Sequence, residues 1–352
     1  MALGYYEGGG FTTVVNALAT NLDALGYGVT VTAHTVRMEP PSGIRVIETA
    51  PSEFSKLVED HDVTHIHLSY PFIKAAVKDN ISPYLLTHHG YTPWHLVPGF
   101  SNKIVHLGLR WAYQNLLHKV PLMTAVSGYV QDQLYELYGL RPPIIPNGVE
   151  DIFFEPEDDL NLDGDPVIFN STGWNWQKGV DLLVRDFAAI KRVNPEARLY
   201  VVTTEHNRSP LLKHVEKFKV KDSVTALPYL DLETLSKYYR SADIYLLTSR
   251  WESFGLPIIE SFASETPVLA REIKDARRDH IESSGGGLLY GDRAELVSGL
   301  RSILAERSVF SGRAKKYAHQ FRWGDIVERY LQLYQRMLND KAPHTNPLGL
   351  SI

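Results

Sequence analysis

Two series of short apolar runs constrain the fold of this chain more than any other feature. The runs have the length of β-strands, and segments with apolar residues at helical spacing separate them. This alternation is typical of an α/β architecture with parallel strands. In the first half we expect strands at 3–6, 29–34, 44–48, 63–68, 84–87, 122–126 and 144–145. In the second half we expect them at 167–170, 199–203, 223–227, 244–247, 268–270 and 288–290.

Residues 150–166 separate the two series. This segment is acidic, contains flanking prolines and has no apolar period, which is typical of a linker. A chain of 352 residues is also too long for one comfortable core. We therefore expect two domains, 1–155 and 166–320, then a last amphipathic helix and a flexible tail at 339–352.

Composition excludes several classes of protein. A net charge of −5 argues against a general nucleic-acid binder, which needs a clustered basic surface. The absence of Cys excludes disulfides, zinc–thiolate sites and cysteine nucleophiles, and it fits a reducing cytoplasm. No apolar window is long enough to span a membrane, and the N-terminus has no signal-peptide pattern. A cytoplasmic location is the resulting expectation.

The most informative local pattern is the stretch from Arg250 to Glu260. It follows the apolar run 244–247, and Pro257 suits the first position of a new helix. A strand, a glycine-containing turn and a helix commonly build a ligand crevice at the carboxyl edge of a parallel sheet. The first-turn N–H groups can hold a phosphate, and Glu252 and Glu260 can accept hydrogen bonds from sugar hydroxyls. The alternative is a glutamate that only stabilises its own helix.

A second glycine-rich turn, Gly8-Gly9-Gly10, follows the first expected strand and precedes a helix over 11–25. Such a turn lets a ligand approach the backbone, and the helix N-terminus favours an anion. A dinucleotide fingerprint would need a third glycine and an acidic residue at the end of the next strand, where this chain has His34. The pattern therefore disfavours a dehydrogenase, and a bare tight turn is the alternative.

No Asp or Glu occurs between Asp79 and Asp132. The interval contains five histidines, many aromatic residues and the cations Lys103, Arg110 and Lys119. Its central helix, about 103–119, places Ile104, Leu107, Trp111 and Leu117 on one face and Lys103, His106, Arg110 and Gln114 on another. The plain interpretation is an amphipathic helix with a buried apolar face and a basic exposed face. The alternative is attraction for an anionic acceptor or for anionic lipid at the inner membrane face, through 91–119.

The stretch Arg250–Glu260, including Phe254-Gly255-Leu256-Pro257, resembles the Glu-x7-Glu motif of retaining glycosyltransferases of family four. The resemblance extends from about Gly8 to Tyr334. It implies the GT-B fold: two Rossmann-like α/β/α domains that face a central cleft, with a C-terminal helix over 321–338 that returns to the first domain. It also implies a retaining, metal-independent transfer of a sugar from a nucleotide-diphosphate sugar to a hydroxyl of a glycan, a lipid-linked acceptor or a small molecule. No cofactor and no metal are expected.

The resemblance also implies roles for individual residues. Glu252 would orient the donor sugar, Glu260 would bind the ribose, and Lys178, which matches the family's Lys-Gly with Gly179, would stabilise the leaving diphosphate. Trp174 stands where the family has an arginine, so we expect Arg250 to substitute. The remaining donor-binding residues implied are Gly9, Gly10, Ser253, Phe254, Gly255, Leu256, Tyr229 and Leu230.

On the acceptor side the resemblance implies His89, which precedes Gly90, as a catalytic residue near donor sugar and acceptor. A hydrogen-bonded structural histidine is the alternative. Tyr91, Trp94 and Arg110 are the further acceptor-binding candidates.

Two other functions stay open at this point: a nucleotide-sugar epimerase with the same fold, and a non-catalytic protein that binds a nucleotide sugar or a lipid. The charged segment 273–278, where the family has a Gly-Gly-x-Pro-Glu turn, has no assignable role from sequence.

Overall fold

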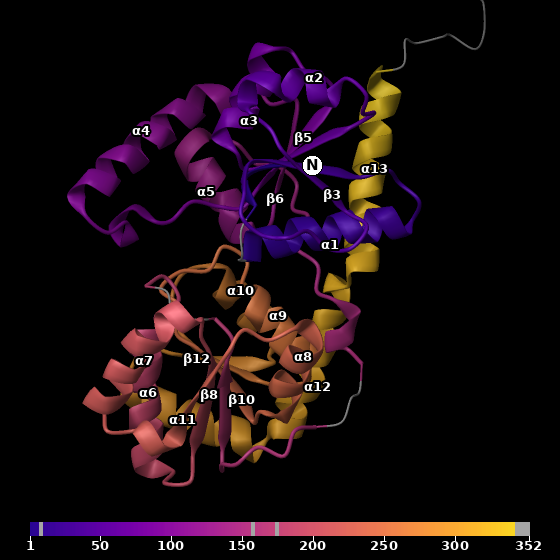
Figure 1. The fold of residues 1–352 in the computed structure, drawn as a ribbon. Coiled ribbons are helices and arrows are strands. Elements are labelled where there is room, and N and C mark those ends of the chain that lie inside the picture. Colours follow the sequence, from indigo (N-terminus) through magenta and orange to yellow (C-terminus); the bar gives the residue numbers. More distant parts are fainter. Residues whose placement is uncertain (7–9, 156–158, 173–175, 342–352) are drawn as a thin grey trace, which may run out of the picture. The chain divides into compact units, whose positions relative to one another are not determined.

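The computed structural model describes residues 1–6, 10–155, 159–172 and 176–341. The chain divides into two compact units. The first unit consists of Met1–Gly148 and Trp323–Ile352, and the second unit consists of Val149–Arg322. Figure 1 labels their helices and strands. Gly9 and Trp174, both singled out in the sequence, lie outside the described residues.

A six-stranded sheet in the order β3-β2-β1-β4-β5-β6 forms the centre of the first unit. All of its neighbouring strands are parallel, as the sequence predicted. The strands are β1 (Ala2–Tyr6), β2 (Thr30–Val36), β3 (Arg45–Glu48), β4 (Thr64–His67), β5 (Tyr84–His88) and β6 (Leu122–Ala125). Within the described residues the expected strand at 144–145 is absent, and Ile144 makes one bridge to Ala125.

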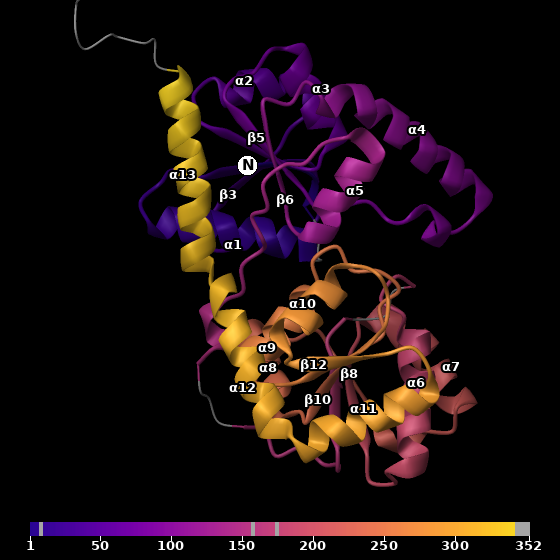
Figure 2. The same ribbon diagram turned by 180° about the vertical axis from the view of Figure 1, so that it is seen from behind.

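Helices cover the first sheet because its central strands are buried on both faces, and every residue of β4 and β5 is buried. They are α1 (Gly10–Ala24), α2 (Phe54–Val58), α3 (Tyr70–Lys78), α4 (Phe100–Leu117), α5 (Gly128–Tyr138) and α13 (Trp323–Lys341). The C-terminal helix α13 packs against α1, and Figure 2 shows the two from behind. Tyr334 of α13 hydrogen-bonds His65 of β4 at 2.7 Å, so this helix belongs to the first unit.

The second unit repeats this arrangement with the order β12-β11-β10-β7-β8-β9, again parallel throughout. Its strands are β7 (Val167–Asn170), β8 (Arg198–Val202), β9 (Val224–Leu227), β10 (Ile244–Leu247), β11 (Val268–Arg271) and β12 (Gly287–Tyr290). Its helices are α6 (Val180–Val193), α7 (Glu205–Lys217), α8 (Leu232–Ser241), α9 (Leu256–Ala263), α10 (Ala276–Ser284), α11 (Arg293–Ala305) and α12 (Arg307–Ala318).

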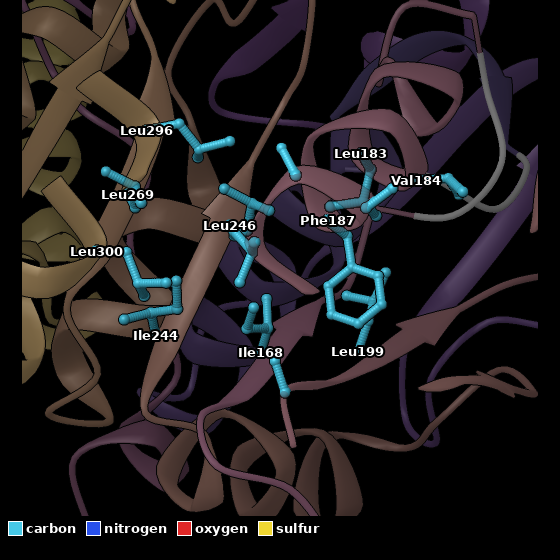
Figure 3. Packing of buried hydrophobic residues seen from close by; sticks show 14 of the residues in the cluster. Ile168, Leu183, Val184, Phe187, Leu199, Ile244, Leu246, Leu269, Leu296 and Leu300 are labelled. Carbon is cyan, nitrogen blue, oxygen red and sulfur yellow. The ribbon is translucent and has the colours of Figure 1, made fainter. Parts of the chain in front are cut away.

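The core of the second unit lies between the sheet and the helices α6 and α11. Figure 3 shows Phe187 of α6 and Leu300 of α11 among the side chains of the central strands. In both sheets the strand order reverses beside the first strand, which places β1 next to β4 and β7 next to β10. Ligands of open parallel sheets bind outside the carboxyl ends of the strands at such a reversal.

The apolar face of helix α4 differs from the sequence-based prediction. Leu117 of α4 is buried as expected, but Ile104, Leu107 and Trp111, predicted on the same buried face, are exposed. The two buried residues of the helix, Tyr113 and Leu117, lie in its C-terminal half. Among the described residues no helix is long and apolar enough to cross a membrane.

Candidate functional site

Two loops meet at the strand reversal of the second sheet, one after β7 and one after β10. The amide of Arg250 donates to the Gln177 carbonyl at 2.7 Å, and the Thr248 hydroxyl donates to the Gly179 carbonyl at 3.0 Å. Gly179 has a φ of +62°, and a Cβ there would lie 2.3 Å from the Thr248 carbonyl oxygen. Only glycine allows this approach, so position 179 fixes how closely the loops pack.

The helices α6 and α9 both begin directly after these loops. Gly179 precedes α6 and Gly255 precedes α9, and both glycines have left-handed backbone angles. Neither glycine has a side chain that could cap its helix, whereas the Asp181 carboxylate accepts from the amides of Asp181 and Leu182 in the first turn of α6. Leu182 and Ile258 donate to the carbonyls of Gly179 and Gly255, so only the earliest N–H groups of each helix lack a partner there, and with the helix dipoles these favour an anion.

A lysine and a glutamate, one from each loop, form an ion pair at this point. The Lys178 ammonium donates to both carboxylate oxygens of Glu252, at 2.9 and 3.1 Å. Glu252 is only 4% exposed, and burial by itself would raise its pKa. The Lys178 charge and hydrogen bonds outweigh burial and hold the pKa of Glu252 below its usual value. Glu252 is therefore ionised, and a negatively charged ligand could compete with it for Lys178.

The charged segment that the sequence left unassigned holds Glu252 in place. The amide of Glu252 donates to Oδ2 of Asp275 at 2.8 Å. Arg277 donates to both oxygens of Asp275 at 2.8 Å, and its side chain is fully buried. Burial raises the pKa of Asp275, although the Arg277 charge opposes the rise. This buried pair had no sequence signal beyond two opposite charges in a loop.

Glu260 lies on the first turns of α9 and is half-buried. Tyr239 of α8 donates to its Oε2 at 2.8 Å, and the same hydroxyl contacts Ser171 at 2.6 Å. Burial raises the pKa of Glu260 to about 7, although the Tyr239 hydrogen bond and Lys178 lower it. Its carboxyl group therefore changes protonation near neutral pH. The sequence analysis did not identify Tyr239 or Ser171, because neither residue belongs to a recognisable motif.

Arg250 already has an anionic partner. Its guanidinium makes two hydrogen bonds to the Asp181 carboxylate, at 2.9 and 2.7 Å, and one to the Trp176 carbonyl at 2.6 Å. The three bonds fix Arg250 beside the first turn of α6. Binding of Arg250 to a diphosphate stays a prediction, because the ligand would have to share the guanidinium with Asp181.

The stretch after Glu252 combines packing with backbone geometry. Phe254 is buried, and His280 donates through Nε2 to its carbonyl oxygen at 2.8 Å. Burial lowers the pKa of His280 to about 4, so this ring is neutral and suited to that single donation. Ser253 and Leu256 are half-buried on either side. Any binding of the donor by this stretch would therefore come from its backbone amides.

Tyr229 and Leu230 are not brought to the ion pair. They follow β9, which is the edge strand, and β7 and β8 lie between it and β10. Tyr229 is 84% exposed. Their predicted contact with a nucleotide base stays a prediction.

In the first unit the strand reversal gathers a histidine pair. His89 follows β5, and its Nε2 lies 3.1 Å from Nδ1 of His67 at the end of β4. The ring of Phe11, in the first turn of α1, meets the His89 ring edge-on at 4.6 Å, and Gly10 begins that helix. Burial lowers the pKa of His89 to about 3, so the ring is neutral at physiological pH. No sequence motif points to His67.

The other acceptor-side candidates have structural contacts. Gln133 holds both the amide and the carbonyl of Tyr91, at 2.7 and 2.8 Å. Trp94 is half-buried beneath Lys103, whose ammonium lies 5.6 Å from its ring centroid. Arg110 is half-buried on α4, and its carbonyl accepts from Tyr138. Acceptor binding by Tyr91, Trp94 and Arg110 therefore remains a prediction.

Among the described residues no three His, Asp or Glu side chains are placed to hold a metal ion. The second unit instead offers a lysine, an ionised glutamate and the starts of two helices beside a strand reversal. This is the general form of a phosphate-binding site in a doubly wound α/β protein.

Comparison with known proteins identifies the family. Residues 8–151 match the model described as Glycosyltransferase Family 4, and residues 152–321 match the model described as Glycosyl transferases group 1. The chain therefore belongs to the family 4 glycosyltransferases, and the resemblance seen in the sequence is confirmed.

A D-inositol 3-phosphate glycosyltransferase of Kineococcus radiotolerans is 26% identical, over 96% of this chain and 92% of that protein. Sucrose-phosphate synthase of Thermosynechococcus elongatus superposes with a TM-score of 0.78 at 21% identity, covering 96% of this chain and 99% of that one. HepE of Anabaena, solved with UDP and glucose, has a TM-score of 0.74 at 14% identity, covering 96% and 100%. The predicted GT-B fold is confirmed.

Proposed function

We propose that this glycosyltransferase moves a sugar from a nucleotide-diphosphate sugar to an acceptor hydroxyl, with retention of configuration and without a metal ion. The observation that carries the proposal is the ion pair of Lys178 and Glu252 beside the first N–H groups of α6 and α9. A diphosphate would bind these N–H groups and Lys178, and the developing charge on the leaving group would meet a preorganised cation. The solved relative HepE holds UDP and glucose, which supports a nucleotide-sugar donor.

Glu252 and Glu260 would bind the rest of the donor. When the diphosphate engages Lys178, the carboxylate of Glu252 becomes an acceptor for hydroxyls of the donor sugar. Glu260, fixed by Tyr239, would accept hydrogen bonds from the ribose in its ionised form. In the first unit the neutral ring of His89 would hydrogen-bond the donor sugar and the acceptor without adding charge.

In the proposed front-side reaction the bond from the anomeric carbon to the diphosphate oxygen breaks while the acceptor oxygen bonds the same face of that carbon. The acceptor proton passes to the leaving phosphate oxygen. No side chain has to act as a strong base, and Lys178 supplies the positive charge.

The acceptor class follows from the relatives alone. Two of them are named for phosphorylated products or acceptors, an inositol 3-phosphate and a sucrose phosphate. We include small phosphorylated polyols and sugars among the acceptors, beside glycans and lipid-linked acceptors. Peripheral membrane contact through 91–119 is a separate proposal, because it depends on α4 and not on the donor site.

A direct test combines binding with product analysis. A thermal-shift screen with UDP-, GDP- and ADP-sugars should reveal a donor, because a ligand that binds only the folded state raises the melting temperature. Transfer to an acceptor panel is then measured with and without EDTA, and NMR of the product gives the anomeric configuration. A product of inverted configuration would refute the retaining mechanism, and loss of transfer in EDTA would refute metal independence. No stabilisation by any nucleotide sugar would refute the proposed donor class.

A further inference from the structure

The helix α4 exposes an apolar stripe that the donor site does not need. Phe100, Ile104, Leu107 and Trp111 are 81%, 56%, 50% and 71% exposed. Their spacing of four, three and four residues places them along one face of the helix, and we call this set the apolar stripe. Val105 and Leu109 are also exposed, so six of the seventeen large exposed hydrophobic residues in the described chain lie on this one helix.

Exposure of this kind is costly unless another surface covers it. Figures 1 and 2 show α4 at the outside of the first unit, beside α3 and α5. The apolar surface continues on its other side into a pocket of about 250 Å³, which Val97, Val105 and Leu109 help to line. Both sides of α4 therefore present carbon atoms to solvent.

All fully charged side chains in the chain segment that contains the apolar stripe are positive. Lys103 and Arg110 lie one turn apart from Leu107 on either side, along one border of the stripe. No Asp or Glu occurs from residue 80 to 131, although the whole chain carries a net charge of −5. The Lys103 ammonium lies over the ring of Trp94, 5.6 Å from its centroid. The local field therefore attracts anions.

We propose that α4 docks this protein on anionic phospholipid surfaces. The apolar stripe inserts at the boundary between headgroups and acyl chains, and Lys103 and Arg110 pair with lipid phosphates. A helix that lies in a membrane interface has this combination of an apolar face and bordering cations. The proposal goes beyond sugar transfer, because it requires neither the donor nor the acceptor site.

Charge distinguishes this occupant from a second copy of the chain. In a twofold pairing of α4 with itself, the cations of both copies would approach across an interface whose α4 segment carries no carboxylate. A surface of anionic lipid satisfies the same cations. The lipid is therefore the occupant that the charge pattern favours.

The test measures binding of the whole protein to sucrose-loaded vesicles by co-sedimentation. One vesicle type contains only phosphatidylcholine, and the other mixes phosphatidylcholine with phosphatidylglycerol. The stripe variant is Ile104→Ser/Leu107→Ser/Trp111→Ser, and all three sites are exposed, so the fold should persist. The matched control is Leu212→Ser/Leu232→Ser/Val309→Ser, at three exposed apolar sites of the second unit. Lys103→Glu tests the charge.

We expect the wild type and the control variant to bind the mixed vesicles, and to bind phosphatidylcholine more weakly. Burying one such side chain changes a binding constant about tenfold or more, so the stripe variant should bind at least ~100-fold more weakly. Lys103→Glu should weaken binding to the mixed vesicles by about 5- to 25-fold and leave binding to phosphatidylcholine unchanged.

Three results would overturn the proposal. The first is no binding of the wild type to mixed vesicles, and the second is equal binding by the stripe and control variants. The third is a dimer in sedimentation velocity that the stripe variant abolishes, which would make α4 an interface between copies. Circular dichroism of each variant verifies that the fold is kept. Vesicle binding and sugar transfer are measured separately, so failure of one leaves the other intact.

Discussion

The half-buried carboxyl of Glu260 gives the sharpest physical test of the donor site. Burial penalises the charged form and raises the pKa of Glu260 from an ordinary 4.5 to about 7. A raised carboxyl pKa means that the folded protein binds a proton that the unfolded chain does not hold at the same pH. The resulting stability is present at low pH and is lost as the pH rises through about 7.

The perturbation is Glu260→Gln, which removes the titration and keeps an oxygen that can accept from Tyr239. Linkage between the two pKa values gives a contribution that differs by about 2.5 kcal/mol between about pH 8 and pH 5. Relative to Glu260→Gln, the wild type should therefore gain about 2.5 kcal/mol of unfolding free energy over this range as the pH falls. Urea unfolding of both proteins at several pH values measures the difference, in which all other titrating groups cancel.

The exposed site Glu216→Gln is the control, and its stability should follow the wild type at every pH. A difference between wild type and Glu260→Gln that stays constant to within about 0.5 kcal/mol across the range would refute the buried-carboxyl reasoning. A difference of opposite sign would show that the ionised form is the one the fold stabilises.

The remaining predictions concern ligand binding and the two loops. Calorimetry should show that, below about pH 7, the affinity of the wild type for a nucleoside diphosphate falls by up to ~10-fold per pH unit relative to that of Glu260→Gln. If the ratio of the two affinities does not change with pH, Glu260 is not part of the site. Lys178→Ala should lower turnover at least ~10-fold, since a charge-assisted bond to the leaving group is worth over ~1.4 kcal/mol, whereas Lys237→Ala should match the wild type. In thermal unfolding, Gly179→Ala should lower the free energy of unfolding by about 1 kcal/mol or more beyond the loss in Gly139→Ala. Both glycines have left-handed backbone angles, but only a Cβ at position 179 would meet a carbonyl oxygen. Equal losses of stability in the two variants would contradict the close approach of the loops.

The local structure followed closely from sequence because its signals are short-range. Apolar runs such as 244–247 became buried strands, and the order of strands and helices fixed a parallel α/β fold. The glycine before α9 and the Lys-Gly before α6 were visible as turn residues, and the Glu-x7-Glu stretch pointed to the family that the comparisons confirmed. The missing strand at 144–145 shows the limit, since two apolar residues carry too little pattern.

The contacts between the site residues could not be predicted from the sequence in this way. Nothing near Lys178 in the sequence indicates that its partner is Glu252, and the buried pair of Asp275 and Arg277 looked like an ordinary charged loop. The contact between His67 and His89 depends on β4 and β5 being neighbours in register. The Lys178–Glu252 and His67–His89 pairings join residues that only strand order brings together.

Sequence alone determined which segments are strands, which turns need glycine and which family of proteins the chain belongs to, because these depend on patterns within a few residues. Tertiary structure decided which charges meet, which raises one carboxyl pKa and lowers another, because burial and distance act between segments far apart in the chain. It also decided that the apolar face of α4 is exposed. Helical spacing is the same whether a face packs against a core or against solvent, so only the packed fold could distinguish the two.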